Sequence, residues 1–224
     1  MDKKIEEIAE QDKYRETVHK LICFKGVKTL TALAVIVEIG DFTRFVKAKN
    51  FAAAIPVFEE LIAADSTNAN AAIRLGMAYM STNKTAEAEK AYLLAARHGE
   101  EAQANKQLSN LYVKKASAAL KAKQTQEAYD FAIKANEYLE NANAYKIAGQ
   151  CAMTLGKAAE GLPLLEKYVE LSPNAKDAAQ MKFNIAATAQ KLGDKEKAKA
   201  YYQQVLGDPK FGAQAKAQYD ALNK

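Results

Sequence analysis

The sequence predicts an all-α protein built as a solenoid of stacked helix–turn–helix units. A small residue recurs at intervals of 34, 40, 33 and 37 positions, and a period near 34 is typical of such repeats. A core-type residue follows four positions later, one helical turn away. The 224 residues include only 10 Gly and 4 Pro, so breakers of helices are scarce. The small residues are Ala54, Ala88, Ala128, Gly161 and Ala198, and the core-type residues are Phe58, Tyr92, Ala132, Leu165 and Tyr202.

Each full unit opens with a first helix that carries an apolar residue at position seven and a small residue at position eight. The small residue lets the second helix approach closely. Lys115 departs from this rule and is predicted to weaken its unit. The units begin at Ala69, Ser109, Ala142 and Ala179, and the paired residues are Leu75-Gly76, Lys115-Ala116, Ala148-Gly149 and Ile185-Ala186.

The turn between the two helices falls at position fifteen of each unit. Three of the four residues there tolerate positive φ, as a tight turn needs. Pro56 and Pro163 are predicted to lie in the first turn of a second helix, where a missing N–H has no partner to lose. The turn residues are Asn83, Lys123, Gly156 and Gly193, and the second helices are predicted over residues 86–97, 126–138, 159–171 and 195–206.

The first 50 residues carry no trace of this period. Residues 1–21 are predicted to form one charged helix, and residues 30–39 a second helix that is apolar almost all round. Gly26 separates the two, and Gly40 ends the second.

The repeated register resembles the tetratricopeptide repeat (TPR) family over residues 51–206, most clearly through Leu75, Gly76, Tyr79, Ala88 and Tyr92. The resemblance implies a right-handed superhelix of helix pairs, with the first helices lining a concave groove. It also implies one half repeat followed by four repeats. Residues 207–224, with a helix over 211–222, resemble the polar cap that ends such an array.

The N-terminal segment resembles a different family. The strings Leu21-Ile22-Cys23-Phe24-Lys25-Gly26-Val27-Lys28 and Gly40-Asp41-Phe42-Thr43-Arg44-Phe45 resemble the C-terminal domain of Piv-related insertion-sequence transposases. The resemblance covers residues 1–53 and implies a short helix-hairpin-helix-like domain at 1–50. The catalytic domain of that family is absent from this sequence. We interpret the chain as a fusion that replaced the original N-terminus of the repeat array.

The leading functional hypothesis is a non-enzymatic scaffold that binds a peptide or protein in the groove. In the resembled family, positions two, five, nine and twelve of each first helix face that groove. The residues there combine amides with apolar anchors, and the alternative is that some apolar ones only pack between units. The candidates are Asn70, Ile73, Met77, Met80, Asn110, Val113, Ser117, Leu120, Asn143, Lys146, Gln150, Met153, Gln180, Phe183, Ala187 and Gln190.

The alternative function is DNA binding by the N-terminal segment through Lys25, Lys28 and Arg44. Residues 1–50 contain ten Lys and Arg against eight Asp and Glu, a net charge of only +2. Phosphate binding strengthens with the number of phosphates neutralised, so nucleic acid is the less favoured partner.

An enzyme is disfavoured because no nucleophile with a nearby base, Gly-rich phosphate loop or metal-ligand cluster is evident. We expect no cofactor and no metal, and we expect Cys23 and Cys151 to be free, buried thiols. The first residues lack an apolar signal-peptide core, and no apolar run is long enough to span a bilayer. We therefore expect a cytoplasmic chain without membrane association, although the ancestral array could have been exported. The sequence leaves the partner and the oligomeric state open.

Overall fold

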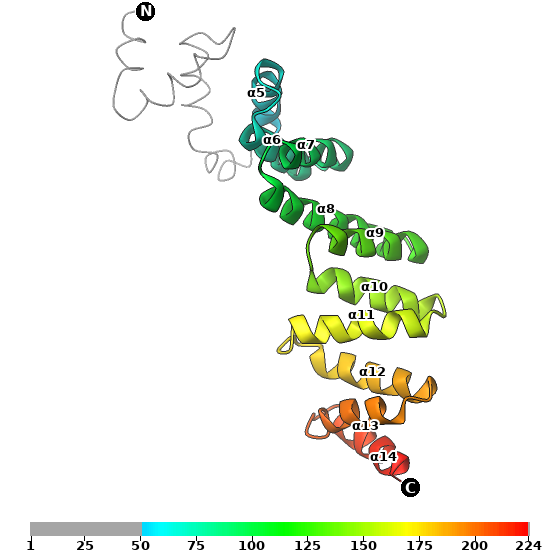
Figure 1. The fold of residues 1–224 in the computed structure, drawn as a ribbon. Coiled ribbons are helices and arrows are strands. Elements are labelled where there is room, and N and C mark those ends of the chain that lie inside the picture. Colours follow the sequence, from blue (N-terminus) through cyan, green and yellow to red (C-terminus); the bar gives the residue numbers. More distant parts are fainter. Residues whose placement is uncertain (1–50, 224) are drawn as a thin grey trace, which may run out of the picture. The chain divides into compact units, whose positions relative to one another are not determined.

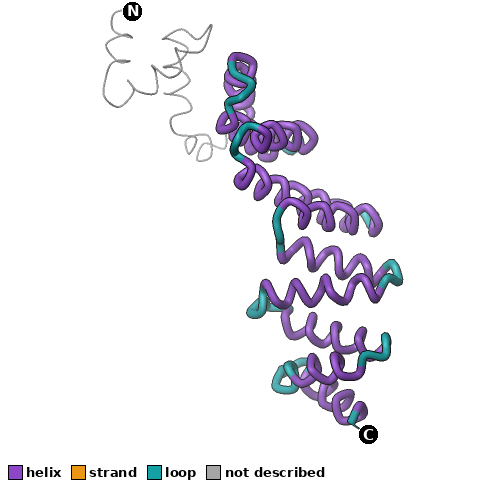
Figure 2. The backbone as a smooth tube through the Cα atoms, in the orientation of Figure 1, coloured by secondary structure: helices purple, strands orange, loops and turns teal. Residues whose placement is uncertain are grey.

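A computed structural model describes residues 51–223 and folds them into helices joined by short loops (Figures 1 and 2). These residues contain no strand, which confirms the all-α prediction. The helices predicted over 1–21 and 30–39 lie outside the described residues. In chain order the described helices are α5 (Phe51–Ala64), α6 (Ala69–Ser81), α7 (Thr85–Arg97), α8 (Glu101–Lys121), α9 (Thr125–Tyr138), α10 (Ala142–Thr154), α11 (Ala158–Leu171), α12 (Ala178–Lys191), α13 (Lys195–Gln203) and α14 (Gly212–Leu222).

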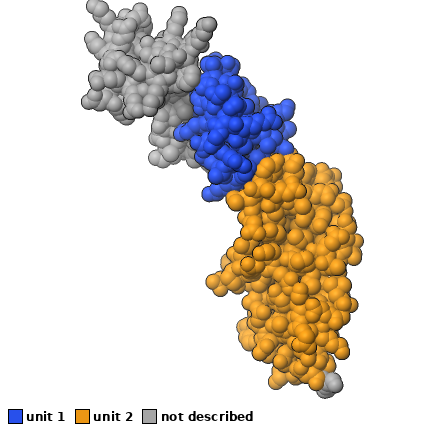
Figure 3. All heavy atoms as spheres, in the orientation of Figure 1, with its two compact units in different colours: residues 1–108 blue, residues 109–224 orange. Residues whose placement is uncertain are grey.

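Two compact units divide the chain, Met1–Leu108 and Ser109–Lys224 (Figure 3). In the first unit, α5, α6 and α7 pack in sequence order, as expected for a half repeat followed by a full repeat. Ala54, Phe58 and Ala88 are completely buried, and Tyr92 is 1% exposed. A Cβ atom added at Gly76 would overlap the Tyr92 ring, so the bare backbone of α6 is what admits this side chain.

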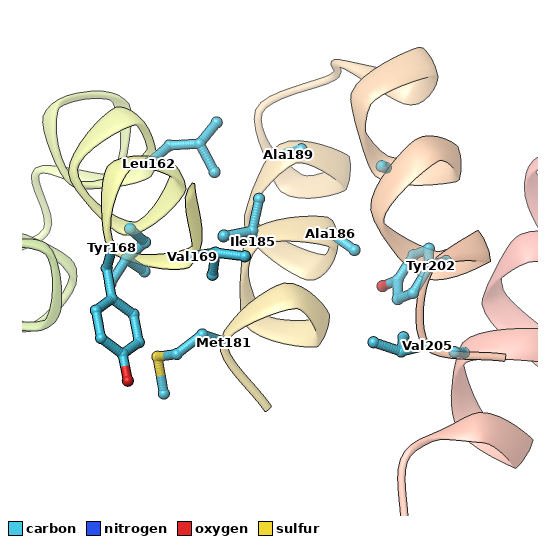
Figure 4. Packing of buried hydrophobic residues seen from close by; sticks show 12 residues of the cluster. Leu162, Tyr168, Val169, Met181, Ile185, Ala186, Ala189, Tyr202 and Val205 are labelled. Carbon is cyan, nitrogen blue, oxygen red and sulfur yellow. The ribbon is translucent and has the colours of Figure 1, made fainter. Parts of the chain in front are cut away.

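The second unit contains two apolar clusters that follow the predicted pattern. Ala116 and Ala119 of α8, Ala128 and Ala132 of α9, and residues of α10 form one cluster. The other joins α11, α12, α13 and α14, and Figure 4 shows how its larger side chains meet. In it Ala186 of α12 faces Tyr202 of α13 (Figure 4). The predicted small and core-type positions are all buried in both units, which confirms the register.

The irregular spacing of 40 between Ala88 and Ala128 is explained by a long first helix. α8 begins at Glu101, about two turns before the unit start predicted at Ser109. Because the extra residues lie at the N-terminal end of α8, the register of the following turn and of α9 is preserved.

All four turns predicted at position fifteen adopt left-handed backbone conformations. The φ angles are 76° at Gly156 and 85° at Gly193, and 64° at Asn83. Lys123 also takes a φ of 62°, although lysine seldom does so. In each turn the next residue donates its N–H to a carbonyl five positions back, as Lys84 does to Tyr79 and Gln124 does to Ala119. The tight helical connection therefore imposes the conformation, whatever residue occupies the position.

The prolines are placed less regularly than the sequence predicts. α11 begins at Ala158, so Pro163 is its sixth residue and lies in the second turn. Pro56 likewise lies at the sixth position of α5. The first-turn prediction is wrong for both, because the helices begin three residues before the small positions 54 and 161. Pro173 and Pro209 lie between helices, as predicted.

The predicted cap is present as α14. Ala215 is completely buried, and Tyr219 and Leu222 pack against the cluster of α11–α13. Elsewhere α14 carries exposed polar residues, among them Gln214, Lys216 and Asp220. α13 ends at Gln203, three residues earlier than predicted, and a loop of turns leads to α14.

Candidate partner-binding surface

The first helices of residues 109–223 contact one another through side chains. Ala116 and Ala119 of α8 share an apolar cluster with Ile147, Ala148 and Cys151 of α10. α10 and α12 meet through polar contacts to sulfur atoms. The Nε2 atom of Gln150 lies 3.9 Å from Sδ of Met181, and Oγ1 of Thr188 lies 3.9 Å from Sδ of Met153. We call the sequence-predicted residues on these three helices the first-helix surface: Asn110, Val113, Ser117, Leu120, Asn143, Lys146, Gln150, Met153, Gln180, Phe183, Ala187 and Gln190.

An exposed amide begins the first-helix surface in every repeat. Asn110, Asn143 and Gln180 occupy equivalent positions and are all exposed. An amide side chain both donates and accepts hydrogen bonds, so it can pair with a peptide backbone. In residues 51–108 the equivalent residue, Asn70, is also exposed, and its Oδ1 atom accepts a hydrogen bond of 2.8 Å from Nε of Arg74.

Behind the amides the surface is half-buried and largely apolar. Val113, Gln150 and Met153 are each half-buried, as is Ser117. Val113 packs against the cluster of α8–α10, and Met153 packs against that of α11–α14. Leu120 is 40% exposed, which makes it one of the few large apolar side chains open to solvent among the described residues. These residues offer shallow apolar contact next to hydrogen-bonding groups.

The charge of Lys146 is already partnered. Its Nζ atom forms a salt bridge with Asp177, just before α12, and lies 5.4 Å from the centroid of the Tyr168 ring. The hydroxyl of Tyr168 donates a hydrogen bond of 2.5 Å to Asp177. The hydrogen bonds from Lys146 and then from Tyr168 lower the pKa of the Asp177 carboxyl, while burial and the bond to Asp177 raise the pKa of Tyr168 to about 12. Lys146 therefore holds α10, α11 and α12 together.

Phe183 and Gln190 are engaged with the C-terminal end of the array. The Phe183 ring lies 5.5 Å from that of Tyr202 and 5.6 Å from that of Phe211. Oε1 of Gln190 accepts a hydrogen bond of 2.9 Å from Tyr202, and its Nε2 donates one of 3.2 Å to Gln218. The Phe183 ring therefore packs against neighbouring helical segments, as the alternative interpretation of the apolar candidates expects.

In residues 51–108 the four candidates of α6 differ in solvent exposure. Asn70 is exposed, and Met77 and Met80 are half-buried. Ile73 is only 2% exposed, so it belongs to the packed interior. The candidates Lys25, Lys28 and Arg44 for nucleic-acid binding lie outside the described residues, as does Cys23. Cys151 is a free thiol and 1% exposed, and burial raises its pKa.

A cluster of aromatic rings and lysines on α8 and α9 is a feature that the sequence pattern missed. The rings of Tyr112 and Tyr138 stack with centroids 5.7 Å apart. Nζ of Lys115 lies 4.9 Å from the Tyr112 centroid and 5.6 Å from that of Phe131, and Nζ of Lys134 lies 4.7 Å from Tyr112. The spacing of Tyr112 and Lys115, one helical turn apart, was the available signal. Lys115 is therefore in cation–π contact at the position where the pattern favours an apolar residue.

Within residues 51–223, no group of His, Cys, Asp and Glu side chains has the arrangement of a metal site. The same residues include no helix that is both long and apolar enough to cross a membrane.

Comparison with known proteins accounts for both parts of the chain. A 42-residue segment is 57% identical to the transposase for insertion sequence element IS1533 of Leptospira borgpetersenii. It represents 19% of this chain and only 12% of the transposase. This match supports the transposase-like fragment that the sequence analysis places in residues 1–53.

Solved structures with a similar fold include MamA, 19% identical with a TM-score of 0.49 over 82% of this chain and 94% of MamA. YrrB, described as a TPR protein with an unusual peptide-binding site, is 21% identical with a TM-score of 0.44 over 78% of this chain and 88% of YrrB. Models of the tetratricopeptide repeat match residues 45–107, 114–176 and 179–207, and the helix pairs of the structure follow these matches. Beyond its transposase-like fragment, the chain belongs to the tetratricopeptide repeat family, whose helical solenoids are protein–protein interaction scaffolds.

Proposed function

We propose that this chain is a non-enzymatic scaffold that binds a peptide or protein segment on the first-helix surface of residues 109–223. The observation that carries the proposal is the recurrence of an exposed amide on three adjacent first helices, at Asn110, Asn143 and Gln180. No hydrogen bond to any of these three side chains is found in the described part of the chain. Their donors and acceptors therefore remain available to a partner.

The chemistry of the surface suits a polypeptide. Amide side chains satisfy the N–H and C=O groups of a bound backbone, and these groups must be paired when binding removes water. Leu120 and the half-buried Met153 supply apolar contact beside them, and Met adapts to ligand side chains of varied shape. In residues 51–108, Asn70, Met77 and Met80 repeat the same combination on α6.

The test is selection of peptides from a displayed random library on the immobilised full chain, followed by affinity measurement of the recovered peptides. We expect Asn143→Ala combined with Gln180→Ala to weaken binding about tenfold, because two hydrogen bonds of about 0.5–1.5 kcal/mol each are lost. The matched control is Gln126→Ala combined with Gln203→Ala, which removes exposed amides from the second helices α9 and α13.

The control variant is expected to bind like the parent chain. Recovery of no peptide, or equal weakening by the two double variants, would show that the first-helix surface is not the binding site. Circular dichroism of each variant checks that the helices remain folded.

A further inference from the structure

Acidic residues are distributed unequally between the first and second helices of residues 109–223. The second helices each carry at least one carboxylate in the first turn, where the helix dipole stabilises negative charge: Glu127 in α9, Glu160 in α11 and Glu196 in α13. The first helices α10 and α12 have none there. Moreover, α10, α12 and the part of α8 from Ser109 onward contain no Asp or Glu at any position.

Helix stability does not explain this difference. A carboxylate in the first turn of α10 would gain the same stabilisation as Glu127 or Glu160 gains, whereas α12 already has Asp177 at its N-cap. In residues 51–108 the contrast recurs, because α6 carries only Arg74 as a charged residue whereas α7 contains Glu87 and Glu89. Acidic residues are thus absent from α6, α10, α12 and the part of α8 from Ser109 onward, although α8 has Glu101 in its first turn.

The charges that remain on these helices are positive. Lys121 and Lys191 end α8 and α12 at equivalent repeat positions, next to Leu120 and Gln190 of the first-helix surface. Both lysines are exposed, and neither forms an ion pair with the described residues. They are therefore available to a partner.

The carboxylates that border the first helices are already engaged. Asp177, which precedes α12, is bound by Lys146 and Tyr168. Glu140, which precedes α10, accepts a hydrogen bond of 3.0 Å from the hydroxyl of Tyr145. Asp194, which follows α12, accepts a hydrogen bond of 3.0 Å from the backbone N–H of Lys197. These contacts tie each carboxylate to a neighbouring group, and Lys146 compensates the charge of Asp177.

We infer that the first-helix surface selects an acidic peptide segment, with Lys121 and Lys191 pairing with its carboxylates. This inference rests on the proposed function, because it specifies the chemistry of the ligand that binds there. The exposed amides of Asn143 and Gln180 donate N–H groups to the peptide, and Leu120 contacts its apolar side chains. The two lysines attract the carboxylates of such a segment. A basic segment would find no Asp or Glu on these helices to pair with its charges.

A peptide fits these residues better than a nucleic acid does. Tight binding of a duplex needs many neutralised phosphates, and Lys121 and Lys191 supply few. The same surface places the exposed apolar side chain of Leu120 and half-buried Met153 beside the amides, where a phosphate backbone has no complementary group.

The experiment compares three pools of fluorescent decapeptides on the full chain at 50 mM and 300 mM NaCl. The pools share random apolar residues at alternate positions and carry Glu, Gln or Lys at the others. We expect the Glu pool to bind at least tenfold more tightly than the Gln pool at 50 mM, and the advantage to shrink at 300 mM through screening.

A charge reversal locates the effect. Lys121→Glu combined with Lys191→Glu is expected to weaken binding of the Glu pool at least tenfold and to leave the Gln pool within about twofold. The matched control, Lys90→Glu combined with Lys216→Glu, changes the net charge equally at exposed residues of α7 and α14. It is expected to retain the preference for the Glu pool.

Three results would overturn the inference. In the first, the Glu and Gln pools bind equally, and the Asn143→Ala, Gln180→Ala variant binds both more weakly. This result leaves the proposed function intact but removes the acidic preference. Binding of no pool contradicts the proposed function as well. Displacement of the Glu pool by a short DNA duplex at equal concentration, but not by an unlabelled acidic peptide, would identify a nucleic-acid surface instead.

Discussion

The helix pairs α8–α9 and α10–α11 are joined by turns of the same left-handed conformation but fill the seam between their helices differently. In α10–α11, Gly149 leaves room for Leu165, and a Cβ atom at position 149 would lie 2.6 Å from its Cδ2 atom. In α8–α9 the equivalent residues are Ala116 and Ala132, both completely buried. The residues at the two positions therefore differ in size in a compensating way.

Both pairs also contain a lysine that lies over an aromatic ring of the partner helix. Lys115 of α8 lies over Phe131 of α9, and Lys146 of α10 lies over Tyr168 of α11. In the second case the carboxylate of Asp177 also binds the lysine. Each pair is therefore joined by an apolar seam and by a lysine that contacts an aromatic ring of the partner helix.

The difference between the two seams can be tested by converting the α10–α11 seam into the α8–α9 seam. Leu165→Ala is expected to lower the free energy of unfolding by about 2–5 kcal/mol, because it leaves a cavity beside Gly149. Gly149→Ala is expected to destabilise the parent chain, because overpacking against Leu165 outweighs the gain of about 1 kcal/mol in helix propensity. In the Leu165→Ala background the same change should stabilise the chain by about 1 kcal/mol. Urea unfolding followed by circular dichroism measures all four members of the cycle.

Additive effects in this cycle would contradict compensation between the two positions. Ala148→Gly, at the neighbouring buried position of α10, serves as a control for helix propensity alone. It should lower stability with a similar magnitude in both backgrounds.

A second prediction concerns the lysine of the other pair. Lys115→Met keeps an apolar stem of similar length and removes the ammonium group from the rings of Tyr112 and Phe131. We expect the free energy of unfolding to fall by about 0.5–2 kcal/mol, the range of cation–π contacts. Thermal and urea unfolding measure the change. Unchanged or increased stability would instead support the sequence-based prediction that Lys115 weakens its unit.

The smallest expected effect is a dependence of stability on pH that Asp177 contributes to the α10–α11 pair. The pKa of Asp177 is lowered in the folded chain, so its contribution to stability is present above the ordinary pKa of an aspartate. That contribution is lost as the pH falls through the lowered value. Asp177→Asn should therefore lose less stability than the parent chain between pH 5 and about pH 2. The melting temperatures of the two proteins across this range provide the measurement, and parallel curves would show that Asp177 adds nothing.

The seam could be predicted from the sequence because it depends on volume and periodicity. Ala54, Ala88 and Ala198 recur with one large apolar neighbour, and all of them are buried. The extension of α8 could not be predicted in this way, because helix-forming residues added to a straight helix leave no break in the pattern. The register placed a turn at Lys123, but its left-handed conformation could not be predicted, since the constraint comes from the connection and not from lysine.

The candidate site was less predictable than the fold. Repeat position selected Asn110, Asn143 and Gln180, and all three side chains are exposed. The same position rule selected Ile73, whose surroundings bury it, and Lys146, whose charge is taken by Asp177. Those outcomes depend on contacts between repeats that lie about 30 residues apart, which a register of single positions does not contain.

The arrangement of α14 suggests where the protein tolerates a change of length. Its inner face, with Ala215, Tyr219 and Leu222, covers the apolar cluster to which α13 contributes. A gene duplication that inserted whole pairs before residue 207 would keep this terminal helix in place. A deletion of it would instead expose Tyr202 and Val205 to neighbouring molecules.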